Sequence, residues 1–207
     1  MERLICLAVG YCFGLIQTSY IFGKIKGFDI RKKGSGNAGT TNAIRTMGWK
    51  TGMLTLLVDV FKCIAAVLLM RYVFRASDIS LLLGMYAAAG VILGHNFPFY
   101  LKFKGGKGIA ASVGMMIAFG DWRLIIAGII CFFVPFLLTR YVSVGSLVLY
   151  AGFLVGMIIS GQAGNYSMAQ DALTEMYVLT AALTALAYWQ HRANIKRLIQ
   201  GKENRLF

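Results

Sequence analysis

The chain has 207 residues, of which 58% are hydrophobic and only 14% charged, and its mean hydropathy is +0.67. A soluble domain of this length would carry far more charge, so the alternation of long apolar runs with short basic ones predicts an all-α, polytopic membrane protein. The net charge of +13 fits positive-inside topology and an anionic substrate or lipid surface, and we expect no nucleic-acid partner.

The first predicted helix covers residues 4–22, an apolar run about as long as a membrane span. No convincing cleavage site precedes the basic segment after it, so we expect a retained helix and not a signal peptide. A basic loop then covers residues 23–50.

The most polar and glycine-rich stretch of the chain lies inside this loop, at residues 32–42. Its glycines let the backbone bend and bring N–H groups close to a ligand, which predicts an anion cradle with phosphate as the usual guest. The charges alone would also fit a solvated basic loop. The dinucleotide fingerprint that the glycine spacing matches lacks its βαβ setting here. The candidate residues are Gly34, Ser35, Gly36, Asn37, Gly39, Thr41, Asn42 and Arg45.

The second predicted helix covers residues 51–70 and holds an ionisable pair, Asp59 and Lys62, on one face. Such a pair at membrane depth is either functional or a structural ion pair that faces the bundle interior. The third helix covers residues 79–93 and ends at His95 and Pro98. His95 is a candidate general base, with a structural helix-end histidine as the alternative.

A second glycine-lysine loop leads into the fourth helix, and a helix N-terminus again suits an anion. The loop is not a Walker A motif, because Leu101 replaces its first glycine. Its candidate residues are Lys104, Gly105, Gly106, Lys107 and Gly108. The fourth helix, residues 109–119, is short for a full span, so we expect it either to start inside the polar loop or to be a partial helix buried by its neighbours.

Three further helices are predicted over residues 124–138, 144–159 and 172–189, followed by a basic tail over residues 190–207. Ser143 lies in the turn before the second of these helices. His191 and Asn194 are three residues apart at the end of the last one, so both can face the bundle interior. The four cysteines lie in apolar segments without metal-type spacing, and we expect neither a disulfide nor a metal site.

Seven helices place the two termini on opposite sides of the membrane. With the glycine loops in the cytoplasm, sixteen of the 21 Lys and Arg residues lie inside, Lys62 lies within a helix, and the outside carries only Arg3, Arg71, Arg75 and Arg123. This asymmetry predicts an outside N-terminus and a cytoplasmic C-terminus for one integral membrane domain over residues 1–207. It also gathers the two glycine loops, the Ser143 turn and the His191 tail on one face, as an active site requires.

Six motifs in register resemble the bacterial acyl-phosphate-dependent glycerol-3-phosphate acyltransferases, the PlsY family. The motifs are residues 34–42 with Arg45, residues 59–62, 94–98 and 103–108, residues 140–143, and residues 191–198. Their order and spacing cover essentially the whole chain. One departure is Cys63 where a glycine is expected after Lys62, which concerns packing more than chemistry.

The resemblance implies transfer of an acyl chain from acyl phosphate to the 1-hydroxyl of glycerol 3-phosphate, giving lysophosphatidic acid and phosphate at the bacterial cytoplasmic (inner) membrane. The acyl chain would contact membrane lipid, with no direct acyl-carrier protein or coenzyme A donor and no cofactor. Because acyl phosphate is already activated, the enzyme needs mainly to orient substrates and stabilise charge. We expect Ser35, Arg45, His95, Lys107 and His191 to be catalytic, and Ser143 and Asn194 to complete the binding pocket.

The general base stays open among His95, His191 and a phosphate oxygen of the substrate, and neither histidine has an acidic neighbour in the sequence. A covalent role for Ser35 is disfavoured, because an activated donor makes an acyl-enzyme unnecessary. The competing class is a transporter for a phosphorylated anion, which would be expected to show internal repeats and polar residues near the bilayer midplane. A scaffold protein would leave the glycine loops unexplained.

Overall fold

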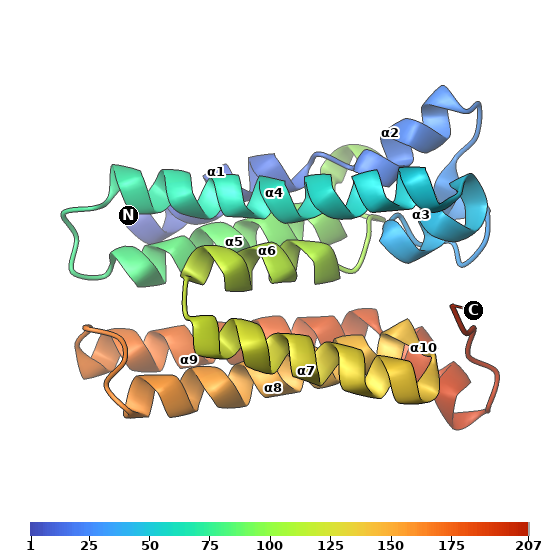
Figure 1. The fold of residues 1–207 in the computed structure, drawn as a ribbon. Coiled ribbons are helices and arrows are strands. Elements are labelled where there is room, and N and C mark those ends of the chain that lie inside the picture. The colour runs from blue at the N-terminus through green and yellow to red at the C-terminus, as the bar shows by residue number, and fades with distance from the viewer. Residues whose placement is uncertain (207) are drawn as a thin grey trace. The chain divides into compact units, whose positions relative to one another are not determined.

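The computed structural model describes residues 1–206, and within that range every regular element is a helix, which confirms the all-α prediction (Figure 1). The chain divides into two compact units, Met1–Phe119 and Gly120–Phe207.

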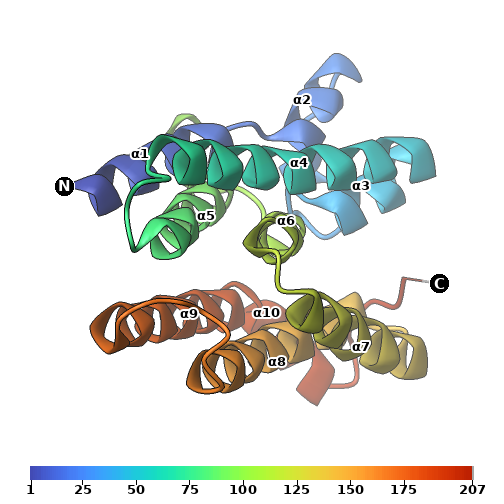
Figure 2. The same ribbon diagram turned by 60° about the vertical axis from the view of Figure 1, so that its left-hand side comes forward.

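The first unit holds most of the polar motifs. Its elements are α1 (Glu2–Gly14), α2 (Thr18–Ile25), η1 (Ile30–Lys32), α3 (Thr40–Met47), α4 (Trp49–Val73), α5 (Ser80–Asn96), η2 (Phe99–Leu101) and α6 (Ile109–Phe119). The helices α1, α4, α5 and α6 lie side by side, with α2 and α3 at one end of them (Figures 1 and 2).

Glycines allow α1 and α5 to pack backbone against backbone. A Cβ atom at Gly10 would overlap the carbonyl oxygen of Ala87, and one at Gly90 would overlap that of Leu7. Gly14 and Gly94 repeat this contact one turn further along the two helices. Small residues spaced by four allow such close approach in membrane helices. The packing sets the end of α5, which carries His95, against the end of α1.

The first predicted segment, residues 4–22, lies within one candidate membrane span, Glu2–Ile25, but it is not a single helix, because the chain breaks between α1 and α2. The fully buried Gln17 occupies the break, and its Nε2 donates to Gly14 O (3.2 Å) and His95 O (3.0 Å). The freed carbonyl of Ile16 accepts from Lys62 Nζ at 2.7 Å. Irregular backbone inside a membrane protein is stable only where it finds such partners.

The basic loop predicted over residues 23–50 is also partly wrong, because it contains η1 and α3. Ile30, Ala38 and Ala43 form a buried apolar cluster, against which Tyr20 and Phe28 pack. This small core explains why part of a polar segment is helical.

The second unit contains α7 (Trp122–Thr139), α8 (Val142–Gln162), α9 (Gln170–Gln190) and α10 (Arg192–Ile199). Helix α8 packs against both α7 and α9, with Leu149, Phe153 and Met157 in its buried face (Figure 2). The three long helices match the predicted ranges within a few residues, whereas α10 lies in the segment described only as a basic tail.

Five helical segments are long and apolar enough to cross a membrane: Glu2–Ile25, Trp49–Val73, Ser80–Leu101, Trp122–Thr139 and Val142–Gln162. Helix α6 is a shorter apolar helix, as predicted. Helix α9 is not among the five, and it carries Asp171 and Glu175 near its start. The membrane character is therefore clear, while the seven-span topology and the orientation of the termini stay predictions.

Candidate active site

The first glycine loop is shaped by Asn42, a fully buried residue of α3. Its Oδ1 accepts from the backbone N–H of Ser35 (2.9 Å), and its Nδ2 donates to the carbonyls of Ile30, Lys33 and Asn37 at 3.0–3.2 Å. The Asn42 side chain thus holds the first glycine loop in place.

The second glycine loop folds back on the end of α5. The N–H groups of Gly105 and Gly106 donate to the carbonyls of Asn96 and His95, each at 3.0 Å. A Cβ atom at Gly106 would overlap His95 Nε2 and would lie 2.7 Å from the carbonyl oxygen of Ala38. Because Ala38 belongs to the first loop, Gly106 stands where the two glycine loops and His95 meet.

Arg31 ties the two loops together from the outside. Its Nη1 donates to Leu101 O (2.9 Å), and its Nη2 donates to Asp29 Oδ2 (2.7 Å). Hydrogen bonding from the Arg31 side chain lowers the pKa of Asp29 from 3.8 to about 2. This bridge was not predicted from the sequence.

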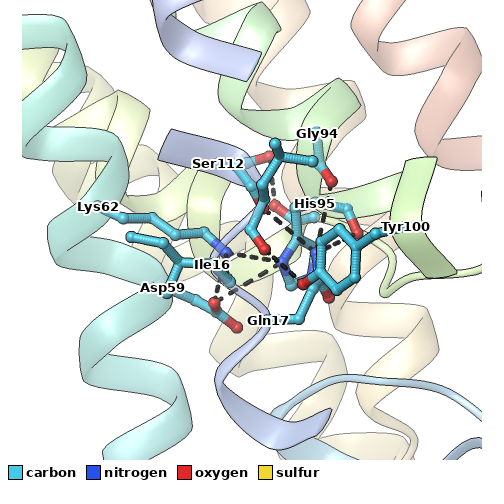
Figure 3. A network of polar contacts seen from close by, with 11 residues as sticks. Ile16, Gln17, Asp59, Lys62, Gly94, His95, Tyr100 and Ser112 are labelled. Carbon is cyan, nitrogen blue, oxygen red and sulfur yellow. Dashed lines mark hydrogen bonds and ion pairs between the residues drawn. The ribbon is translucent and has the colours of Figure 1, made fainter. Parts of the chain in front are cut away.

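A buried polar network joins Asp59 and Lys62 of α4 to His95 of α5 (Figure 3). Lys62 Nζ, in α4, donates to Asp59 Oδ1 (2.7 Å) and to Ile16 O (2.7 Å), and lies 2.9 Å from His95 Nδ1. Asp59, Lys62 and His95 are all at most 4% exposed. The shared face predicted for Asp59 and Lys62 is confirmed.

His95 does have an acidic neighbour in space, which the sequence did not reveal. Asp59 Oδ1 lies 3.7 Å from His95 Nδ1, although the two residues are on different helices. The available signal was the coincidence of an ionisable pair at membrane depth with a polar helix end later in the chain.

Asn96 was not predicted from the sequence as a site residue. It is 2% exposed, and neither polar atom of its side-chain amide has a hydrogen-bond partner within residues 1–206. A Cβ atom at Gly108 would lie 2.9 Å from Asn96 Oδ1. Buried amides are normally bonded, so this group beside the second glycine loop has hydrogen-bonding capacity for a ligand.

In the second unit, Ser143 and Asn194 share an acceptor that was not predicted. Ser143 Oγ (3.1 Å) and Asn194 Nδ2 (2.6 Å) both donate to Glu203 Oε1, and Arg197 Nε donates to Glu203 Oε2 (2.7 Å). His191 Nδ1 lies 2.8 Å from Ala187 O. Because a carbonyl only accepts, this Nδ1 carries a proton.

The remaining predicted residues lie mostly at the surface of the first unit. Helix α3 contributes the half-buried Thr41, and the buried Gly39 immediately precedes it. Lys107 is half-buried, and the exposed candidates are Gly34, Ser35, Gly36, Arg45 and Lys104. The structure therefore gathers the two glycine loops and His95 in one unit, and Ser143 and Asn194 in the other, with His191 just before α10. The convergence of all four motifs stays a prediction.

Comparisons with known proteins cover nearly the whole chain. The family model described as glycerol-3-phosphate acyltransferase matches residues 4–201. A protein of that name from Clostridioides difficile (strain 630) is 40% identical over 206 residues, covering 98% of this chain and 95% of the relative. Another from Thermoanaerobacter sp. (strain X514) is 37% identical, covering 100% of this chain and 96% of the relative.

A solved structure is similar over almost the same range. The crystal structure of PlsY (YgiH), an integral membrane glycerol 3-phosphate acyltransferase in its glycerol 3-phosphate form, matches with a TM-score of 0.84 and 28% identity, covering 99% of this chain and 96% of that chain. Its lysophosphatidic acid form matches with a TM-score of 0.82 and 27% identity, covering 99% and 95%. Together with the family match, these similarities show that the chain belongs to the glycerol-3-phosphate acyltransferase family.

Proposed function

We propose that this protein transfers an acyl chain from acyl phosphate to the 1-hydroxyl of glycerol 3-phosphate, giving lysophosphatidic acid and inorganic phosphate. The names of its relatives and the two ligand forms of the similar structure support the acceptor and the product. The observation that carries the donor assignment is the junction at Gly106, where two glycine loops meet. Two neighbouring anion cradles suit a reaction in which both substrates carry phosphate.

The reaction needs orientation and charge stabilisation more than a strong nucleophile. The 1-hydroxyl oxygen forms a bond to the acyl carbon, the bond from that carbon to the phosphate oxygen breaks, and phosphate leaves. Ser35, Arg45, Lys104 and Lys107, with backbone N–H groups of both loops, would hold the phosphates and stabilise the developing charge. Ser143, His191 and Asn194 would complete the pocket, and the proton would pass to a phosphate oxygen or to His191.

The membrane arrangement is part of the proposal. Seven spans, with the N-terminus outside and the C-terminus in the cytoplasm of a bacterial cell, would place the site at the cytoplasmic face of the inner membrane. The whole chain would act as one domain, with the acyl chain held between helices in contact with lipid. Acyl-carrier protein and coenzyme A would not serve as direct donors.

The test is an acyl-transfer assay on the purified protein in lipid, with palmitoyl phosphate or palmitoyl coenzyme A as donor. We expect matched release of phosphate and lysophosphatidic acid from palmitoyl phosphate only. Lys107→Ala should lower kcat/KM by about 100-fold, the usual loss when a transition-state donor is removed. The exposed Lys102 beside the motif supplies the control, Lys102→Ala, which should keep near-normal activity.

Two results would contradict the proposal in different ways. Turnover with the coenzyme A thioester alone would keep the acyltransferase and overturn the donor. No turnover with either donor, in a preparation whose fold is verified by a cooperative thermal transition, would favour anion transport.

A further inference from the structure

The Lys62 ammonium fixes which nitrogen of His95 carries the proton. An ammonium has three N–H donors and no acceptor. Lys62 Nζ has three partners at hydrogen-bond distance: Ile16 O at 2.7 Å, Asp59 Oδ1 at 2.7 Å and His95 Nδ1 at 2.9 Å. The two oxygens can only accept, so the third N–H points at Nδ1, which must supply a lone pair.

Burial strengthens this assignment. The side chains of Asp59 and Lys62 are each 2% exposed, and their 2.7 Å contact holds both in the charged form, because a lone buried charge is far more costly than a paired one. The two charges cancel, so the network is complete with a neutral His95. A neutral imidazole whose Nδ1 accepts has its proton on Nε2.

The Nε2–H group faces the junction of the two glycine loops. A Cβ atom on Gly106 would overlap His95 Nε2, so only glycine leaves room there, and the carbonyl of Ala38 borders the same position. His95 is only 3% exposed, so this Nε2–H group is largely shielded from solvent. A buried N–H donor at the junction of two glycine loops is suited to an oxygen atom of a ligand held there.

We propose that the Asp59–Lys62 pair positions His95 as a hydrogen-bond donor to a substrate oxygen held between the glycine loops, and that His95 is not the general base. This inference deepens the proposed function and rests on it. Asp59 and Lys62 act as positioning residues, since they touch His95 and the backbone. His95 acts by stabilising negative charge that develops on the substrate oxygen in the transition state.

The first test is the ring ¹⁵N spectrum of the wild-type protein labelled at histidine. The chain has only two histidines, so the spectrum of His191→Asn assigns both rings. We expect His95 to be neutral with its proton on Nε2 and its Nδ1 in a hydrogen bond. A proton on Nδ1 would overturn the proposal. This measurement needs no turnover, so it stays informative even if acyl phosphate is not the donor.

The second test separates a donor from a base. His95→Leu should lower kcat by about 100-fold, as for a lost oxyanion donor. His95→Gln should recover at least about tenfold of that loss, because its amide N–H can donate but its amide cannot take up a proton at neutral pH. Equal inactivity of the Leu and Gln variants, both verified as folded, would overturn the proposal and restore His95 as base.

The third test addresses the positioning pair. Lys62→Met alone would leave Asp59 buried and unpaired, so the double variant Asp59→Leu/Lys62→Met keeps the charge balance and the apolar volume. We expect it to lower kcat by about tenfold or more with a smaller change in KM, because the mispositioned donor acts mainly in the transition state. An unchanged kcat would contradict the positioning role.

Discussion

The candidate residues of the two units are held in different ways. In the first unit, the exposed Ser35 and Lys104 lie on the two glycine loops, and other residues hold these loops in place. Asn42 bonds the first loop, Arg31 bonds Leu101 O before the second loop, and His95 lies where the two loops meet. In the second unit, the candidates Ser143 and Asn194 are themselves buried and donate to Glu203. In the proposed site, the first unit would therefore use different residues for holding the loops and for binding substrate, whereas in the second unit Ser143 and Asn194 would do both.

Removing the Asn42 side chain, which holds the first glycine loop in place, should have the largest effect on turnover. Asn42→Ala would leave one N–H and three carbonyls without their partner, and each buried unpaired group costs about 1–3 kcal/mol. We expect the loop to open, turnover to fall by about 100-fold, and trypsin to cut faster at Lys32 and Lys33. Thr46→Val is the control, because Thr46 Oγ1 bonds only the Asn42 backbone carbonyl. Normal turnover in Asn42→Ala would remove the distinction between support and binding.

Removing Glu203, the shared hydrogen-bond acceptor of the second unit, should have the next largest effect on stability and turnover. Glu203→Ala would leave the Ser143 hydroxyl and the Asn194 amide without their acceptor, and we expect about 1–3 kcal/mol less stability in thermal unfolding, with turnover falling in parallel. Glu203→Gln should be milder, because its amide oxygen still accepts and only the Arg197 ion pair is lost. A lower KM for glycerol 3-phosphate in Glu203→Ala would instead show that Glu203 competes with the substrate.

Loosening the bridge between the two glycine loops should have a moderate effect. Asp29→Asn removes the charge that orients Arg31 toward Leu101 O. We expect KM for glycerol 3-phosphate to rise about fivefold, equivalent to ~1 kcal/mol for a partly exposed ion pair, with kcat nearly unchanged. Steady-state kinetics measure both, and a loss confined to kcat would contradict a role in loop spacing.

The Asp29–Arg31 ion pair also predicts a change in the stability of the protein at acid pH. The pKa of Asp29 is about 2 in the folded protein against an ordinary 3.8, so its contribution is fully present above about pH 4 and is lost as the pH falls toward 2. Between about pH 4 and pH 2, the stability of the wild type should therefore fall more steeply with pH than that of Asp29→Asn. Identical acid-unfolding curves would argue against the Asp29–Arg31 bridge.

The smallest effect on stability and turnover is expected from a substitution in the polar cluster near the C-terminal end of α8, away from Ser143. Burial raises the pKa of Asp121, but hydrogen bonds from Arg123, Tyr166 and Ser160 outweigh it and lower that pKa below its ordinary value. Burial and the bond to Asp121 raise the pKa of Tyr166. Tyr166→Phe should cost ~1 kcal/mol in thermal unfolding and leave turnover unchanged, since Ser160 and Ser143 lie at opposite ends of α8. Reduced turnover without lower stability would show that this end also takes part in function.

Long apolar runs made most helices predictable. Residues 109–119 were predicted as a helix and form α6, Ile109–Phe119, because a glycine-rich loop and Gly120 bound the run sharply. The glycine loops were recognisable because their composition departs so strongly from the apolar segments around them. The bounds of the other long helices agree within a few residues, where ends depend on local caps.

The features that were missed depend on bonds between distant residues. The break before α2 is stabilised by Gln17, whose side chain bonds the backbone of His95. Helix α3 is stabilised by the Asn42 bonds and by the small cluster around Ile30. The contact of Asp59 with His95 and that of Glu203 with Ser143 also join separate elements. Periodicity and composition carry no information about such pairs.

The most direct test of the proposed reaction follows one oxygen atom. Glycerol 3-phosphate labelled with ¹⁸O in its 1-hydroxyl is incubated with palmitoyl phosphate and the wild-type enzyme, and the products are analysed by mass spectrometry. Attack of the hydroxyl on the acyl carbon predicts ¹⁸O in the ester of lysophosphatidic acid, with one unlabelled phosphate released per product. Release of phosphate without labelled lysophosphatidic acid would contradict the account.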